Sequence, residues 1–305
     1  MCYTNKKRNG GDTMAIDVLQ DKIRKAKNPS MVELGLPMGN LPPQLPEGEG
    51  SLPAAYGHFC RELLSGLKGL VPAVRVSFSA FALLGPEGLA QLTQTLKSAS
   101  QLGFYVVLDA PEIWSPMGAG AVAEAVFGEK GMYPCDGLVI PGYLGSDILK
   151  VFLPYCREEK KDLFVAVRTG NKSASELQDL LCGSRMVHTA AADHVNRYGA
   201  ETAGKFGYTR VGVMAAASSA DSLRNLRMKY PGLFLMVEGY DYPNGNAKNC
   251  SFAFDKYGHG AVVCSGVGIS CAWKQNESDG RDYLEHAIAA AERMKRNLTR
   301  YVSVL

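Results

Sequence analysis

The sequence predicts an α/β protein built as one (β/α)8 barrel. Eight short apolar runs rich in β-branched residues are spread over its 305 residues, as expected of buried strands. A segment with helical periodicity follows each run, and such alternation requires a parallel sheet with right-handed crossovers. No G-x-G-x-x-G motif follows the first strand, which weakens the open, doubly wound alternative. Eight units in one chain therefore favour a closed barrel.

The expected elements alternate along the chain. We expect a first helix over 14–27, and then strands at 31–36, 71–78, 104–110, 136–142, 162–169, 210–216, 233–239 and 260–266. The helices between and after these strands are expected at 54–69, 88–103, 119–128, 145–156, 173–182, 186–205, 219–229, 247–254 and 279–299. The stretch 37–53, rich in Pro and Gly, is predicted to be a connection.

Composition limits the class of protein. The chain is 46% hydrophobic and 21% charged, with a net charge of +3. These values are typical of a globular protein, and the charge is too small to indicate binding to nucleic acid or to a membrane. Residues 1–13 are polar and are expected to form a disordered tail, with Met14 as an alternative start. Residues 14–305 are expected to form the single domain.

The cysteines indicate a reducing compartment. Eight cysteines are scattered without a C-x-x-C pair and without Cys/His spacing for a metal. We interpret them as reduced, mostly buried thiols, and expect no metal and no cofactor. Because neither a secretory signal nor a membrane-spanning run is present, the expected location is the cytoplasm.

A stretch after the third strand is the first candidate site. The run Tyr105–Leu108 ends in Asp109, and Pro111 and Pro116 then prevent regular structure. An acid at the point where a barrel strand becomes a loop is typical of a catalytic position, because α/β barrels carry their chemistry at that end. The alternative is that Asp109 only caps the next turn.

Several segments resemble a known family. They include LVPAVRVSFSAFALLGPEGLAQL, GYLGSDILKVFL, LFVAVRTGNKSASELQDLL and GAVVCSGVGISCAWK, in this order. Together they are similar to orotidine 5'-phosphate decarboxylase of the longer bacterial type, from about Asp17 to the last helix. The resemblance implies a barrel, a homodimer with active sites at the dimer face, and conversion of orotidine monophosphate to uridine monophosphate without a cofactor.

The resemblance also implies a catalytic network, which this sequence does not keep. The family carries a Lys on the second strand and an Asp-x-Lys-x-x-Asp motif after the third, whose Lys supplies the proton and whose last Asp enters the partner's site. In this chain the first Lys aligns with Arg75 and the motif's first Asp with Asp109. The proton-donating Lys aligns with Pro111 and the last Asp with Trp114. Proline has no proton to give, and an arginine stays protonated.

The ligand contacts implied by the resemblance are altered as well. The positions that hold the ribose, the base and the phosphate in the family align with Gly35, Gly170, Pro243 and Val267. The mouth has lost cations at Pro111 and Val267 and has gained acids at 112, 238 and 241, which opposes a phosphate dianion. The remaining candidates for ligand binding are Thr169, Asn171, Glu238, Tyr240, and the backbone amides of Gly266 and Gly268.

One pair of side chains and two single side chains allow two interpretations each. Asp109 and Arg75 form either a structural ion pair or a catalytic remnant, and we favour the pair because structural pairs are common. Trp114 is either an anchor at a dimer face or a loop aromatic folded over the mouth. Cys264 ends the last strand and is more simply a buried thiol than a nucleophile, since the sequence offers it no base.

Three functions remain open from the sequence. The first is a paralogue that has lost the family reaction and binds a partner or a small, nucleotide-like ligand weakly. The second is an enzyme with residual decarboxylase activity or a changed reaction in the same pocket. The third is a regulatory subunit that pairs with an intact decarboxylase. We expect a homodimer, with a heterodimer as the arrangement that the third function requires.

Overall fold

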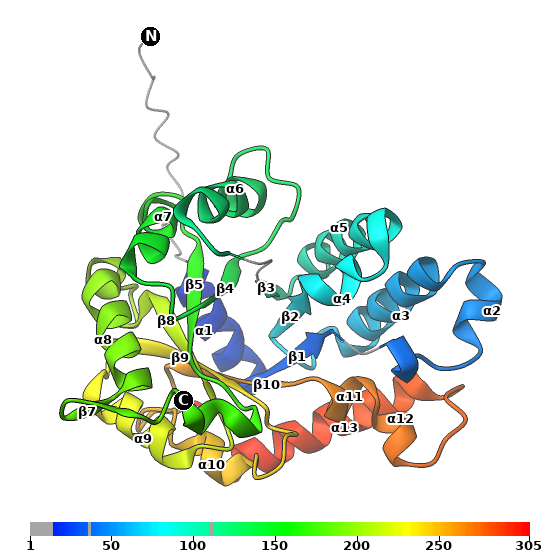
Figure 1. The fold of residues 1–305 in the computed structure, drawn as a ribbon. Helices are drawn as coiled ribbons and strands as arrows, with labels where there is room; N and C mark the ends of the chain where they lie inside the picture. The colour runs from blue at the N-terminus through cyan, green and yellow to red at the C-terminus, as the bar shows by residue number, and fades with distance from the viewer. Residues whose placement is uncertain (1–14, 36–37, 110–112) are drawn as a thin grey trace.

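Eight parallel strands close into a barrel at the centre of the molecule (Figure 1). The computed structural model describes residues 15–35, 38–109 and 113–305. The strands follow one another around the barrel in the order β1-β10-β9-β8-β5-β4-β3-β2. Their bounds are β1 (Ser30–Leu34), β2 (Ala73–Ser77), β3 (Tyr105–Asp109), β4 (Gly137–Pro141), β5 (Asp162–Arg168), β8 (Thr209–Ala216), β9 (Leu233–Glu238) and β10 (Ala261–Ser265). The predicted (β/α)8 barrel is confirmed.

Helices surround the barrel and follow its strands in turn (Figure 1). The longer ones are α1 (Ala15–Ala26), α3 (Leu52–Leu67), α5 (Gly85–Gln101), α6 (Pro116–Phe127), α7 (Ser146–Arg157), α8 (Val187–Gly199), α9 (Ala220–Lys229) and α13 (Tyr283–Thr299). Short helices lie in the connections: η1 (Met38–Asn40), α2 (Leu45–Glu49), α4 (Phe78–Ala82), η2 (Lys172–Glu176), η3 (Ala200–Thr202), α10 (Ala247–Ser251), α11 (Val267–Ser270) and α12 (Ala272–Gln275).

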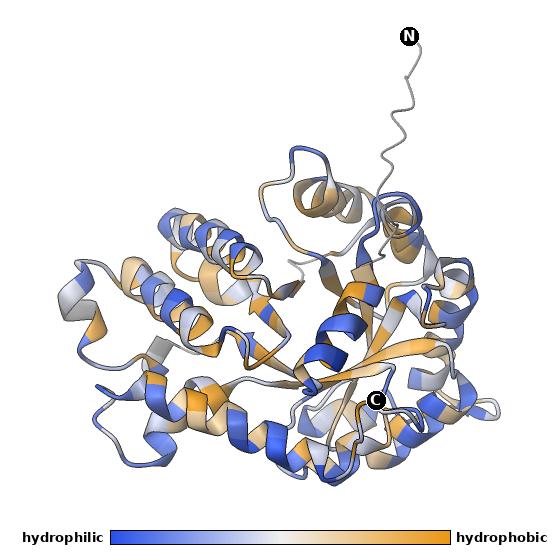
Figure 2. Ribbon diagram, turned by 180° about the vertical axis from the view of Figure 1, so that it is seen from behind, coloured by the Kyte–Doolittle hydropathy of each residue, from blue (hydrophilic) through white to orange (hydrophobic). Residues whose placement is uncertain are grey.

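The apolar residues form two layers of core. One cluster lies between the strands and the outer helices, and the other fills the inside of the barrel with side chains such as Met31, Tyr105, Phe164 and Phe234. Helix α1 contributes Leu19 and other apolar side chains to the inner cluster and so covers one end of the barrel. Figure 2 shows the same division, with hydrophobic colours along the strands and hydrophilic colours on the outer faces of helices.

Helix starts follow local sequence signals. Ser115 accepts a hydrogen bond from the Gly118 amide at 3.1 Å, and Pro116 occupies the first turn of α6. The helix expected at 119–128 therefore begins earlier, at Pro116. Pro116, which was expected only to prevent regular structure after β3, therefore opens the next helix.

One expected helix is partly wrong. The segment predicted as helical over 173–182 is a short 3-10 helix followed by a small antiparallel hairpin of β6 (Leu181–Cys182) and β7 (Arg185–Met186). Gly183 lies in the turn with φ 67°, a conformation that favours glycine. The hairpin shows that turn chemistry at Gly183 overrides the helical pattern of the residues before it.

Two further expectations concern the N-terminal tail and membrane-spanning segments. The tail predicted at 1–13, together with Met14, lies outside the described residues. Within the described ranges, no helix combines the length and the hydrophobicity that a transmembrane span requires.

Candidate functional site

A buried arginine stands at the centre of the barrel mouth. Arg75, the third residue of β2, is only 3% exposed. Its guanidinium lies 2.7 Å from the Glu33 carboxylate, 3.8 Å from Glu238 and 4.0 Å from Asp109. The expected Arg75–Asp109 pair is therefore present, but it is the longest of three contacts. One cation is shared by carboxylates from three strands.

Strand register brings these groups together. Glu33 and Arg75 are directly opposite each other on β1 and β2, and Asp109 pairs with Ser77 on the other side of β2. Asp109 and Glu238 are the last residues of β3 and β9, so both carboxylates start from the carboxyl ends of their strands. The long Arg75 side chain reaches that end from within β2.

Burial and mutual charge shift the pKa values of the cluster. Burial alone would lower the pKa of Arg75, but attraction to Glu33, Asp109 and Glu238 raises it well above its ordinary value. Burial raises the pKa of Asp109 and of Glu238, and the nearby guanidinium opposes both shifts. The arginine is thus fixed as a cation, and its charge limits the rise in the pKa of Asp109 and Glu238 that burial causes.

The backbone amides after β10 donate hydrogen bonds to a carboxylate of the protein itself, that of Asp241. The amides of Gly266 and Gly268 both donate to Asp241 Oδ2, at 3.2 and 2.6 Å. These are the amides predicted to be available to an external anion. Two convergent amides form an anion-binding concavity, and in this chain Asp241 fills it.

The loop after β5 is also held by a carboxylate of the protein, that of Glu238. The Gly170 amide donates to Glu238 Oε1 at 2.9 Å. The Thr169 hydroxyl donates to Asn171 Oδ1 at 2.6 Å and accepts a bond from Gln178. The predicted ligand-binding groups of Thr169 and Asn171 are therefore bonded to each other in this structure.

Tyr242 covers part of the mouth. Its ring lies so close to Gly170 and Gly239 that a Cβ added at either glycine would be 2.7 or 2.4 Å from it. Burial, with Glu238 and Glu33 nearby, raises the pKa of Tyr242 to about 12, so its hydroxyl stays protonated at neutral pH. The space left is a cavity of about 130 Å³, lined by Glu33, Gly35, Tyr242, Gly266 and Val267.

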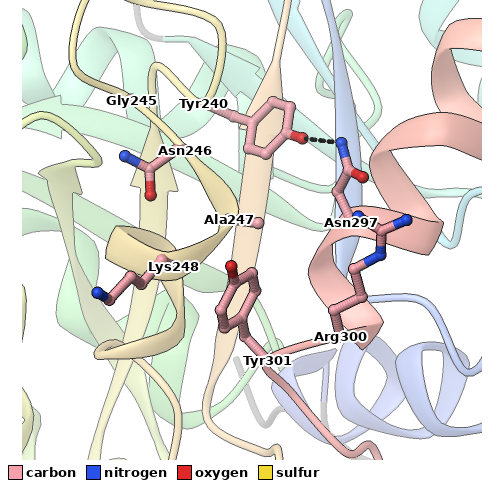
Figure 3. A pocket seen from close by; sticks show the side chains of 8 residues that line it. All are labelled: Tyr240, Gly245, Asn246, Ala247, Lys248, Asn297, Arg300 and Tyr301. Carbon is pink, nitrogen blue, oxygen red and sulfur yellow. Dashed lines mark hydrogen bonds between the residues drawn. The ribbon is translucent and has the colours of Figure 1, made fainter.

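Tyr240, predicted to bind ligand at the mouth, points elsewhere. Its hydroxyl accepts a hydrogen bond from Asn297 Nδ2 on α13 at 3.1 Å, and its ring lines a groove on the outside of the barrel (Figure 3). The expectation for Tyr240 is corrected accordingly. The side chain turns outward because its partner lies on the outer helix.

The two remaining candidates that the structure describes, Cys264 and Trp114, differ in burial. Cys264, next to the end of β10, is fully buried against Met31, and burial raises the pKa of its thiol. It is thus a poor nucleophile. Trp114 is 75% exposed after β3, whereas Pro111 and Glu112 lie outside the described residues. Among the residues the structure describes, no group of three His, Cys, Asp or Glu side chains is arranged to hold a metal ion.

Two residues of the site were missed from the sequence. Glu33 makes the shortest contact to Arg75, and Tyr242 covers the mouth. An acid near the end of the first strand was a usable signal for Glu33, by the same reasoning that singled out Asp109. For Tyr242 the sequence offers no such signal, because the direction of a loop side chain depends on the packing around it.

The buried cation leads to a prediction about stability. Substituting Arg75→Met should lower the free energy of unfolding at pH 7 by about 3 kcal/mol, because the carboxylates would lose their counterion. The loss should shrink as the pH falls toward the raised pKa values of Asp109 and Glu238, since protonation removes the uncompensated charge. Urea denaturation at several pH values measures both effects.

The matched control is Arg157→Met, which removes an arginine from an exposed pair with Glu201. That pair should contribute little at any pH. Equal, pH-independent losses in the two variants would contradict the role assigned to Arg75.

Comparison with known proteins agrees with this architecture. The chain is 31% identical over 256 residues to orotidine 5'-phosphate decarboxylase of Rhodopirellula baltica, covering 81% of this chain and 85% of that protein. It is 24% identical over 288 residues to the enzyme of Clostridium novyi, covering 94% and 99% of the two chains. No protein-family profile matches the sequence.

Solved structures show the same fold. The OMP decarboxylase of Leishmania donovani superposes with a TM-score of 0.71 at 22% identity, covering 93% of this chain and 99% of that one. A Toxoplasma gondii protein assigned as an orotidine-monophosphate decarboxylase gives a TM-score of 0.79 at 21% identity over 95% and 97% of the chains. With the R. baltica relative above 30% identity over most of its length, the chain belongs to the orotidine 5'-phosphate decarboxylase family.

Proposed function

We propose that this chain is a paralogue that has lost the decarboxylation reaction and acts by binding a partner or a small ligand. The observation that carries the proposal is the arrangement of charge at the mouth. Arg75 is shared by three carboxylates, and Asp241 fills the amides that would otherwise be open to an anion.

The first argument concerns the proton. Decarboxylation leaves a carbon that must be protonated, and the resemblance assigns that task to the position of Pro111. Arg75 cannot replace the missing lysine, because its pKa lies well above the ordinary arginine value. The partner-directed carboxylate is replaced by Trp114, which is uncharged.

The second argument concerns the phosphate. A phosphate dianion approaching the mouth would meet Glu33, Glu238 and Asp241, while the nearest guanidinium is already shared. Like charges at such distances oppose binding strongly where water is excluded. The small cavity beside Val267 also offers no side-chain cation to the ligand.

We expect no decarboxylation of orotidine monophosphate by the purified protein. Restoring the motif with Pro111→Lys and Trp114→Asp should not suffice, because Gly35, Pro243 and Val267 still deny substrate binding. Remote phosphate contacts are needed as well as the reacting groups. Loss of absorbance on conversion to uridine monophosphate measures the reaction, with an intact family member as positive control; robust turnover by the unmodified protein would overturn the proposal.

Uridine monophosphate should bind weakly, and Asp241→Ala should strengthen its binding about tenfold by freeing two amides and removing one negative charge. Asp221→Ala is the matched control, because it removes an exposed carboxylate of the same charge from α9. Calorimetry compares the three proteins. Tight binding by the parent, or equal gains in both variants, would show that Asp241 does not block the site.

A second candidate function is pairing with another barrel. Trp114 is 75% exposed and Met117 is 85% exposed, both in the segment that follows β3. In the family this segment enters the partner's site, so an exposed apolar pair here favours an interface. In a homodimer Trp114 would cover the neighbouring mouth; in a heterodimer with an intact decarboxylase it would replace a required Asp and lower the activity of the partner.

Trp114→Ala should therefore weaken self-association, since burial of a large apolar side chain contributes about 1.5–3 kcal/mol. Sedimentation velocity over a concentration series measures the change, and Leu305→Ala, at the exposed chain end, is the control. A monomeric parent rejects the homodimer. For the heterodimer, the decarboxylase rate is measured after subunit exchange, and an unchanged rate despite proven mixed dimers rejects inhibition.

A further inference from the structure

A groove of about 530 Å³ lies on the outside of the barrel, between α10 and the end of α13 (Figure 3). Its size falls within the range of about 300–1,000 Å³ typical of sites for small molecules. The side chains that the argument uses are Tyr240, Asn246, Lys248, Asn297, Arg300 and Tyr301. The groove shares no lining residue with the cavity at the barrel mouth.

The groove is positively charged. Lys248 and Arg300 line it, and its lining contains no acidic residue. Neither cation forms an ion pair within the described chain, whereas Arg296, on the same helix as the groove's Asn297, pairs with Glu292 at 3.5 Å. Figure 3 shows Lys248 and Arg300 on opposite sides of the groove, so the two charges come from separate elements.

The presence of Arg300 could be explained without a ligand. A cation just after a helix is favoured by the helix dipole, and Arg300 directly follows α13. Lys248 belongs to α10, a separate helix, so the dipole of α13 does not account for its position. Two unpaired cations around one polar hollow, with no carboxylate between them, indicate a site for an anion.

The remaining lining favours an anion that carries a ring. The aromatic rings of Tyr240 and Tyr301 both line the groove, with the Tyr240 hydroxyl fixed by Asn297 Nδ2 at 3.1 Å (Figure 3). The Asn246 side chain is likewise held, because its Oδ1 accepts from the Asn249 amide at 2.9 Å. The Tyr240 ring and the two asparagine amides are therefore held in place, so they can contact a ligand at low entropic cost, and the flexible side chains of Lys248 and Arg300 can close on its charge.

We propose that this groove binds a small organic anion with a planar ring, of the aryl phosphate or aryl carboxylate class. The site is distinct from the barrel mouth, where the charge has the opposite sign. The proposal does not depend on whether the mouth is catalytic, because none of its residues belongs to the Arg75 cluster.

Phenyl phosphate is the probe, titrated by calorimetry at low ionic strength. The parent should bind it, and the double variant Lys248→Gln/Arg300→Gln should bind at least about tenfold more weakly. The matched control Arg296→Gln removes a paired cation on α13 and should change the affinity less than about twofold. Circular dichroism verifies that the variants are folded, which is expected since both substituted side chains are exposed.

Two simpler probes separate charge from shape. Inorganic phosphate has the charge without the ring, and benzyl alcohol has the ring without the charge; both should bind more weakly than phenyl phosphate. Hydrogen exchange should show protection by phenyl phosphate at 240–251 and 295–302. Absence of phenyl phosphate binding to the parent, equal binding by the double variant, or protection only at the barrel mouth overturns the proposal.

Discussion

The mouth of this barrel is organised by the need to compensate one buried cation. Transferring a guanidinium out of water costs several kcal/mol even after relaxation, and the cost is recovered only when partners are close and well placed. Arg75 is 3% exposed and meets Glu33, Glu238 and Asp109 from β1, β9 and β3. Because the shortest contact is to Glu33 and not to Asp109, the arginine is bound mainly to its neighbour on β1.

The same rule extends to the loops around the mouth. Glu238 also accepts from the Gly170 amide, and Asp241 accepts from the amides of Gly266 and Gly268. Buried or half-buried carboxylates thus satisfy backbone donors from within the chain. The barrel keeps loops whose geometry suits an anion, but the anion is a side chain of the protein. The chain therefore combines the family's scaffold with a mouth whose backbone donors are bonded to its own carboxylates.

The barrel could be predicted well from the sequence, because the signals for its strands and helices lie in short stretches of adjacent residues. Strand runs and helical periodicity depend on neighbouring residues. Each of the eight expected strands begins and ends within two residues of an observed one. The errors occur where short-range turn chemistry competes with periodicity. At Gly183 a hairpin replaces part of an expected helix, and before Pro116 a serine cap moves a helix start.

The sequence by itself determined the order of strands and helices, the family, and the presence of an arginine at position 75 and a proline at position 111. Only the tertiary structure decided which carboxylate lies nearest Arg75, that Asp241 fills the amides after β10, and that Tyr240 turns outward to Asn297. The physical reason is that strands arise from the periodic pattern of adjacent residues, whereas a loop side chain takes its direction from partners far along the chain. Closure of the barrel brings those partners together, and a pattern of adjacent residues cannot predict such contacts.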